Sequence, residues 1–208
     1  VLQTGVLAFA EAISRGEKQP YRALLDCLER HVPNLRDHSP GDPVVPELRD
    51  LVDETVEAIS KLDGSCLVIQ GPPGTGKTYT SARAIVSLLQ RGARVGVTSN
   101  SHKAINNLLR EVERLASDAR FSFCGAKKAS SNEPETEFDG SFIQSVFSSD
   151  QVGAQHQLVG GTAFHFARPS ELGCYDYLFV DEAGQVALGN LAAMGGAASN
   201  IVLVGEMR

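Results

Sequence analysis

Apolar residues along this chain follow two spacings, one typical of buried strands and one typical of amphipathic helices. Short apolar runs predict strands at residues 66–69, 94–98, 121–124, 157–161, 175–180 and 201–204. Between them, apolar residues recurring every three or four positions predict helices over 79–91, 104–115, 142–147 and 186–194. Strands and helices that alternate across short loops predict an α/β fold, with a doubly wound, mostly parallel sheet of about five or six strands.

The first third of the chain has a different pattern. Residues 1–30 carry apolar residues at helical spacing on either side of Pro20, and residues 31–46 are rich in proline. Pro46 suits the first position of a helix that continues to about Leu62. We therefore predict a helical segment with a proline-rich linker at 1–46 and a separate α/β domain at 47–208. The polar, acidic stretch 125–140 predicts a solvated surface loop.

Composition narrows the classes of function. The 208 residues carry a net charge of −6, which excludes a basic protein that coats nucleic acid without specificity but still allows a local basic groove. The four cysteines are far apart in sequence and form no C-x-x-C pair, which favours free thiols in a reducing cytoplasm. The sequence shows neither a membrane span nor a signal peptide. Because it begins at Val1 and stops inside a motif, we expect a fragment of a longer protein.

A glycine-rich stretch lies between the first predicted strand and its helix. It matches the phosphate-binding pattern G-x-x-x-x-G-K-[ST] without a mismatch. Glycines let backbone N–H groups surround phosphate oxygens, and the start of the following helix adds positive dipole. The stretch predicts a site for a nucleoside triphosphate with Mg²⁺, in which a lysine contacts the β- and γ-phosphates and a threonine ligates the metal. The predicted nucleotide-binding residues are Gly71, Pro72, Pro73, Gly74, Thr75, Gly76, Lys77, Thr78 and Tyr79.

Two adjacent carboxylates, Asp181 and Glu182, follow the buried strand at 175–180. Adjacent acids at a buried strand end are costly unless a cation offsets them. In an enzyme with a phosphate-binding loop, such acids organise Mg²⁺ and polarise the attacking water. We therefore predict that Asp181 holds the metal and that Glu182 is the catalytic base.

A small polar turn, Ser99-Asn100-Ser101, follows the second predicted strand and precedes a helix. One interpretation is an ordinary helix cap by Ser101. The other is a contact with the phosphate backbone of a nucleic acid, made with Lys103 at the start of that helix. The residues alone leave both interpretations open.

The motifs taken in order, GPPGTGKT, TSNSHKAINNLL, GGTAFHFA, DEAGQ and LVGE, resemble the first RecA-like domain of superfamily 1 helicases. The Gln of DEAGQ and the paired prolines are most similar to the 1B group. The second motif also resembles bacterial proteins that join a RecB-like nuclease to a helicase. The resemblance covers residues 66–206.

The resemblance implies a role for each motif. Lys77, Glu182 and Gln185 would be catalytic, with Gln185 sensing the γ-phosphate, and Thr78 and Asp181 would hold Mg²⁺. Ser99, Asn100, Lys103 and Thr162 would contact a single strand, with DNA ranked ahead of RNA, and Gly205 and Glu206 would couple hydrolysis to strand movement. A second RecA-like domain would complete the ATP site and supply arginines. The sequence departs from the pattern at Glu206, where Asp is usual, and it has no adenine-reading Gln before the phosphate loop.

Two other functions fit a phosphate-binding loop. An AAA-type ATPase of protein assembly would need a C-terminal helical lid and an interface arginine, and this chain shows neither. A non-catalytic nucleotide-gated module would not need Glu182. The sequence therefore favours the helicase ATPase and keeps the AAA-type ATPase as its alternative.

Overall fold

The computed structural model describes residues 1–39, 41–45 and 50–206. Its helices are α1 (Leu2–Ser14), α2 (Arg22–Glu29), α3 (Leu51–Ser60), α4 (Lys77–Gln90), α5 (His102–Asp118), α6 (Ala163–Phe166) and α7 (Leu188–Met194). Its strands are β1 (Cys66–Gln70), β2 (Val95–Thr98), β3 (Gly125–Lys128), β4 (Ile143–Val146), β5 (Leu158–Gly160), β6 (Tyr175–Val180) and β7 (Ala198–Gly205). Short 3₁₀ turns join several of these elements.

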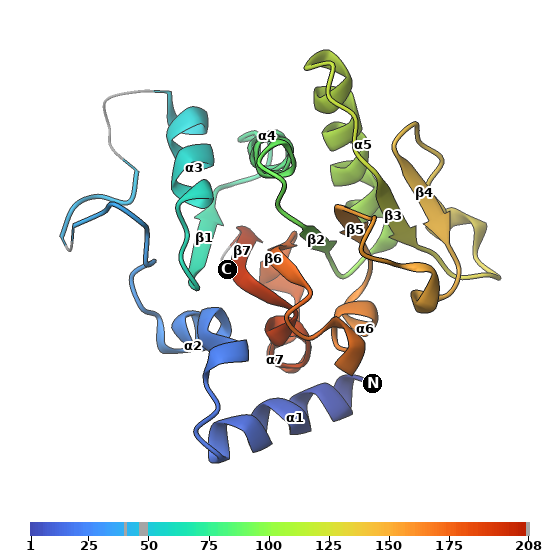
Figure 1. The fold of residues 1–208 in the computed structure, drawn as a ribbon. Coiled ribbons are helices and arrows are strands. Elements are labelled where there is room, and N and C mark those ends of the chain that lie inside the picture. Colours follow the sequence, from blue (N-terminus) through green and yellow to red (C-terminus); the bar gives the residue numbers. More distant parts are fainter. Residues whose placement is uncertain (40, 46–49, 207–208) are drawn as a thin grey trace.

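The strands of the described residues form one seven-stranded sheet in the order β1-β7-β6-β2-β5-β3-β4. Each neighbouring pair is parallel. Parallel neighbours need long crossover connections, and helices in those connections cover both faces of the sheet (Figure 1). The predicted doubly wound α/β fold is confirmed, with one strand more than the sequence indicated and an all-parallel sheet.

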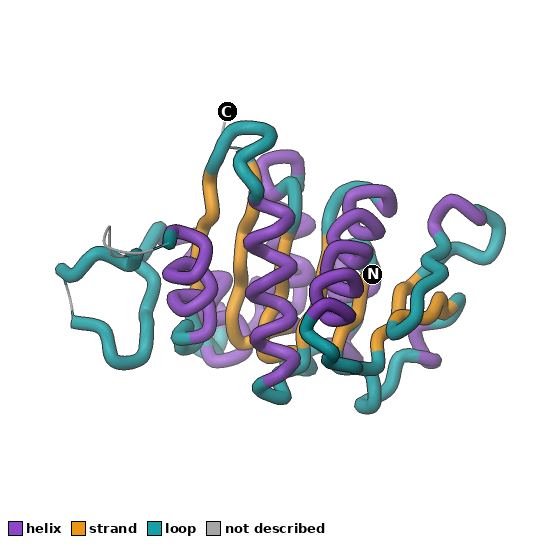
Figure 2. Tube along the Cα trace, turned by 90° about the horizontal axis from the view of Figure 1, so that it is seen from above, coloured by secondary structure: helices purple, strands orange, loops and turns teal. Residues whose placement is uncertain are grey.

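The parallel sheet gathers the loops that carry candidate chemistry at one edge. The phosphate loop follows β1, the Ser99 turn follows β2, and the acidic pair follows β6. Figure 2 shows the strands side by side, with loops at both of their ends. In such sheets, ligands bind beyond the carboxyl ends of the strands.

One face of the sheet is covered by α3, α4 and α5 (Figure 1). Apolar side chains of these helices pack on β1, β2 and β6 in a single core. Its fully buried members include Ile59, Ile85, Ile105, Val97 and Phe179. Burial of this layer fixes α4, and thereby the phosphate loop, on the sheet.

The other face is covered by α1, α2, α6 and α7 (Figure 1). A second core joins them to the sheet, and Leu24, Phe166, Met194 and Ile201 are buried in it. α1 packs directly on α7, so closely that a Cβ on Gly5 would lie 2.7 Å from the Ala193 carbonyl oxygen. The helices before residue 46 therefore share a core with the sheet, and the division of the chain at 46 and 47 stays a prediction.

Helix α3 begins later than the sequence suggested. The Asp50 carboxylate accepts a hydrogen bond of 2.8 Å from the backbone N–H of Val52 and caps the helix at Leu51. Pro46 and Leu48, which we expected inside this helix, lie outside the described residues.

Three predictions between residues 121 and 147 were wrong. Residues 121–124 are not a strand, and the strand β3 begins four residues later, inside the stretch expected to be a solvated loop. Residues 142–147 were expected to form a helix, but they contain the strand β4, which pairs with β3. The apolar spacing at 142–147 suits a helix locally, but pairing with β3 and contacts with α5 determine the backbone.

A carboxylate of α5 holds the start of β4 in place. Glu113 accepts hydrogen bonds from the backbone N–H groups of Ser141, Phe142 and Ile143, at 3.2, 2.7 and 2.9 Å. These donors lie before and at the start of the strand, where a carboxylate can replace missing sheet partners.

No described helix is long and apolar enough to cross a membrane.

We predict that Glu113→Ala lowers the free energy of unfolding by about 1–3 kcal/mol, because it leaves backbone donors without their acceptor. Urea denaturation measures this change. The matched control is Glu111→Ala on the same helix, which loses its partly exposed pair with Arg114 and is expected to cost about 0–1 kcal/mol. Equal losses in both variants would contradict this role of Glu113.

Candidate active site

The loop between β1 and α4 has the backbone that a phosphate cradle needs. Gly74 and Gly76 have φ angles of 79° and 81°, in the left-handed region that glycine adopts without strain. A Cβ on Gly71 would lie 2.7 Å from the Thr75 hydroxyl oxygen, which itself donates to the Pro72 carbonyl at 2.9 Å. These contacts explain the glycine positions of the motif by local geometry.

Lys77 is the first residue of α4, and its side chain reaches back over the loop. Its Nζ donates to the carbonyl oxygens of Gly71 at 2.6 Å and Pro72 at 2.7 Å. The cation therefore lies within the cradle, where phosphate oxygens could replace these carbonyl acceptors. Thr78 follows it on the cavity wall, and Tyr79 is 40% exposed, with the Arg83 guanidinium 6.0 Å from its ring centre.

The acidic pair lies at the end of β6. The backbone N–H of Glu182 donates to the Asp181 carboxylate at 3.0 Å. Burial raises the pKa of Asp181, the Glu182 charge adds to the rise, and the N–H bond and the Lys77 charge oppose it. Glu182 has a φ of 52°, a left-handed conformation that costs a non-glycine residue about 1–3 kcal/mol. Such strain is found where surrounding structure holds a functional side chain in place.

A cavity of about 490 Å³ brings the separate motifs together. It lies between the start of α4, the loop after β6 and the loop after β7. Its lining residues are Lys77, Thr78, Asp181, Glu182, Gly184, Gln185, Gly205 and Glu206. Seven of these eight were singled out in the sequence, and the eighth, Gly184, is the unassigned glycine of DEAGQ.

Close backbone packing holds the three loops against one another. The Gly71 N–H donates to the Gly205 carbonyl at 3.3 Å, which joins the phosphate loop to the end of β7. A Cβ on Gly184 would lie 2.3 Å from the Glu206 carbonyl oxygen. Only glycine fits at position 184, so the loop after β6 lies in direct backbone contact with the end of β7.

The residues predicted to contact nucleic acid fall into two groups, those that contact the acidic loop and those that do not. Ser99 is 4% exposed and its hydroxyl lies 3.5 Å from a Glu182 carboxylate oxygen, while the Asn100 side chain donates to the Gln185 carbonyl. Lys103 is exposed on α5 and Thr162 is half-buried before α6. The Ser101 hydroxyl accepts from the Ala104 N–H at 3.1 Å, so the helix-cap interpretation is confirmed for Ser101. Ser99 and Asn100 thus contact the acidic loop.

The residues present fit a nucleotide with Mg²⁺. The glycine cradle, the Lys77 cation and the half-buried Asp181 carboxylate suit phosphates and a divalent ion. The described residues hold no group of three or more side chains that could bind a metal alone. Mg²⁺ commonly relies on one or two carboxylates together with substrate phosphates, which is the donor set available here.

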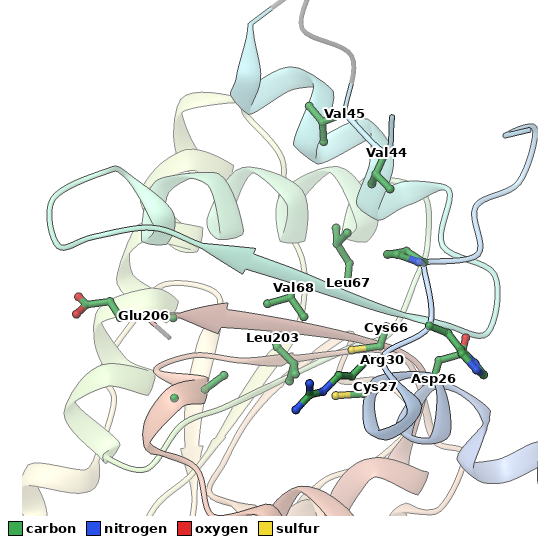
Figure 3. Close-up of a pocket in the computed structure, with 15 residues that line it drawn as sticks. Asp26, Cys27, Arg30, Val44, Val45, Cys66, Leu67, Val68, Leu203 and Glu206 are labelled. Carbon is green, nitrogen blue, oxygen red and sulfur yellow. The ribbon is translucent and has the colours of Figure 1, made fainter. Parts of the chain in front are cut away.

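A larger groove of about 910 Å³ extends from the same loops along the free edge of β1 to α2. Figure 3 shows Val68 and Leu203 on its wall, and Glu206 at the end near the cavity. The Cys27 and Cys66 thiols meet there, and their hydrogen bond together with burial raises the pKa of Cys66. The groove is mostly apolar and was not anticipated from the sequence.

The fold and the cavity define a RecA-like, nucleotide-binding domain of the helicase type. Residues 68–207 match the family described as RNA cytidine acetyltransferase NAT10/TcmA, helicase domain. The chain therefore belongs to this helicase-domain family.

Similar proteins include curated helicases and a solved structure. The Arabidopsis thaliana DNA replication ATP-dependent helicase/nuclease JHS1 is 33% identical over 141 residues, covering 67% of this chain and 10% of that protein. The Saccharomyces cerevisiae helicase/nuclease DNA2 is 33% identical over 103 residues, covering 46% and 6%. The bacteriophage T4 UvsW helicase structure has a TM-score of 0.53 at 13% identity, covering 86% of this chain and 58% of that one, which confirms the fold. The chain spans a tenth or less of these curated relatives.

The raised pKa of Asp181 generates a prediction about stability without divalent ions. The native state protonates this carboxyl at higher pH than the unfolded chain does, so the ionised form destabilises the fold at neutral pH. Asp181→Asn should therefore raise the free energy of unfolding at neutral pH. The gain should shrink as pH falls through the native pKa and vanish below the ordinary value of 3.8.

Urea denaturation across this pH range, in EDTA, tests the prediction. The control is Asp118→Asn, at the exposed end of α5, where the carboxylate pairs with Arg114 in solvent. If the free energies of unfolding of Asp181→Asn and the unaltered protein differed by the same amount at every pH, the raised pKa of Asp181 would be contradicted.

Proposed function

We propose that this chain is the ATP-hydrolysing half of a superfamily 1 helicase, of the 1B type. It couples hydrolysis of Mg-ATP to translocation on single-stranded nucleic acid and to duplex unwinding. The observation that carries the proposal is the cavity in which Lys77 and Thr78 face Asp181, Glu182 and Gln185. Membership of the helicase-domain family supports it.

Each side chain of the cavity has a proposed role. The loop N–H groups from Gly71 to Gly76, with Lys77, bind the phosphates, and Tyr79 contacts the nucleoside side. Thr78 and Asp181 hold Mg²⁺, which neutralises charge on the phosphates when it is bound. Glu182 accepts the proton of the attacking water, and Gln185 contacts the γ-phosphate.

The same loop connects the nucleotide to the nucleic-acid side. Ser99 approaches Glu182, and Asn100 donates to the Gln185 carbonyl. A strand that engages Asn100, with Lys103 and Thr162 beside it, therefore acts on the loop that carries the base. Gly205 and Glu206 transmit the change through their contact with Gly184.

Several partners follow from this proposal. The substrate is a single strand, DNA ahead of RNA, because two of the similar proteins are DNA replication helicases. A second RecA-like domain of the parent chain closes the ATP site, and a fused nuclease domain is supported by the names of the same two relatives. The described cysteines are all free thiols, which supports a cytoplasmic location.

The decisive experiment measures ATP hydrolysis by the full-length protein, with and without single-stranded DNA or RNA. We predict strong stimulation by nucleic acid. Lys77→Ala should abolish both nucleotide binding and hydrolysis, because it removes the cradle's cation. Glu182→Gln should lower the turnover rate by about 10²–10⁴-fold, as expected on loss of a general base, while nucleotide still binds.

Other outcomes would reject parts of the proposal. Hydrolysis that ignores nucleic acid would favour an AAA-type ATPase and leave Asn100 as a purely structural contact. Retained hydrolysis in Glu182→Gln would show that Glu182 is not the catalytic base. The control is Glu17→Gln on the opposite, α1 side of the sheet, where the carboxylate pairs with Arg15 in solvent.

We also predict that residues 1–208 alone bind nucleotide but hydrolyse it slowly. A second RecA-like domain would contribute arginines that are worth about 10³–10⁵ in rate in related phosphoryl-transfer enzymes. Comparing multiple-turnover hydrolysis by residues 1–208 and by the full-length protein tests this. Equal rates would show that the site is complete without a second domain.

A further inference from the structure

A second cavity, the basic pocket, opens beyond the carboxyl ends of β3 and β5 and has a volume of about 390 Å³. This size lies within the range of about 300–1,000 Å³ that is usual for ligand sites. We define the basic pocket by His102, Lys128, Ser130, Thr162, Phe164 and Arg168. It contains Thr162 but not Lys77, so it is separate from the nucleotide cavity.

The basic pocket holds positive charges without a matching acid. None of its described lining residues is Asp or Glu. Burial and the nearby Arg168 charge lower the pKa of Lys128, and the Lys128 Nζ donates only to the Ala129 carbonyl at 2.6 Å. No ion pair among the described residues includes Lys128 or Arg168. The two cations therefore repel one another, and an anion between them would remove that cost.

A third cation lies beneath the basic pocket. The Lys127 side chain is fully buried, and its Nζ donates to the carbonyl oxygens of Lys128 at 2.9 Å and Thr136 at 3.2 Å. It lies 2.8 Å from Nδ1 of His102, which lines the pocket, and no described carboxylate pairs with it. Burial lowers the pKa of Lys127 to about 8, so it is still mainly charged at neutral pH. A buried cation without a counter-charge is costly, which is a second observation favouring an anionic ligand.

Two acidic residues that do not line the basic pocket act on His102. Glu133 and Glu135 act on His102 in the sense that raises its pKa. Burial of the ring and the Lys127 charge outweigh them, so the pKa of His102 is lowered overall. His102 is thus neutral at neutral pH and can donate or accept at a ligand.

An aromatic ring stands beside the cations on a rigid support. Phe164 is 60% exposed, which is unusual for its size, although its neighbours in α6 are buried. His165 beneath it lies 3.2 Å from the Ser149 hydroxyl and 3.3 Å from the Tyr175 hydroxyl, and Tyr175 donates to Glu171 at 2.7 Å. Burial lowers the pKa of His165 to about 4, so its imidazole is neutral at neutral pH, and its contacts with these two hydroxyl groups hold α6 in place.

We propose that the basic pocket binds one nucleotide of a single-stranded nucleic acid, with its phosphate between Lys128 and Arg168 and its base stacked on Phe164. Exposed aromatic rings beside basic groups bind single strands in this way, since every base has a π-face. Thr162 lies in the same pocket, so the strand that we propose for the helicase continues into it. The inference rests on the proposed function and extends its strand path beyond the motifs to Lys128, Phe164 and Arg168.

Fluorescence anisotropy of labelled single-stranded oligonucleotides, DNA and RNA, on the full-length protein tests this inference. For a single strand, the plot of log K against log salt has a slope of about −0.7 per neutralised phosphate. Lys128→Gln and Arg168→Gln should each make this slope shallower by up to about 0.7. The matched control, Lys18→Gln on the α1 side, should leave the slope unchanged.

The aromatic contact has its own signature. Phe164→Leu should weaken binding about 5- to 150-fold without changing the salt slope, because stacking is not a charge interaction. Phe164→Trp should keep the affinity, since it keeps a ring. Thermal unfolding midpoints show that each variant is folded, and neither Lys128→Gln nor Arg168→Gln removes an ion pair among the described residues.

The outcomes separate this inference from the proposed function. If the protein binds single strands, but both charge variants keep the salt slope and Phe164→Leu keeps the affinity, then the strand does not occupy the basic pocket. This result overturns the inference and leaves the proposed function intact. A protein that binds no single strand overturns the helicase proposal and this inference together. In the Lys77→Ala background, which disables the nucleotide cavity, displacement of the labelled oligonucleotide by a free mononucleotide that binds as tightly would show a small-molecule site and would also overturn the inference.

Discussion

Parallel pairing of β6 with β2 on one side and β7 on the other is the constraint on which the candidate site depends. Thr98 lies opposite Val180, and Val180 opposite Leu203, so the loops after these three strands leave the sheet at the same height. The pairing of β7 with β1 adds the phosphate loop to the same edge. Because the chain must cross over between parallel strands, the loops after β1 and β2 lead directly into α4 and α5, and the loop after β6 leads into a helical turn.

Close backbone contacts turn this shared edge into a single site. The Gly71 N–H meets the Gly205 carbonyl, and Gly184 lies against Glu206, so three loops touch without side chains between them. The cost of the arrangement is visible in Glu182, which has a left-handed backbone, and in the raised pKa of Asp181. Strain and buried charge of this kind are offset when a cation and phosphates fill the cavity.

The same edge continues past the nucleotide cavity to the basic pocket. The two regions are joined through α5, since Ser99 and Asn100 precede it and contact the acidic loop, while His102 at its start lines the basic pocket. The turn Ser99-Asn100-Ser101 therefore lies between the nucleotide cavity and the basic pocket.

The sequence by itself determined the fold class and the positions of the glycine-rich turn and of the acidic pair after their strands, because each depends on neighbouring residues whose backbone geometry and chemistry are local. The tertiary structure decided that Ser101 caps α5. Only the tertiary structure decided that residues 143–146 form a strand, since Glu113 and β3 lie far away in sequence and outweigh the local helical spacing. It also decided that Lys127 is buried, that Ser99 and Asn100 contact the acidic loop, and that Lys128, Phe164 and Arg168 share a pocket. Burial and contact between distant residues arise only when the sheet assembles, so no local pattern records them.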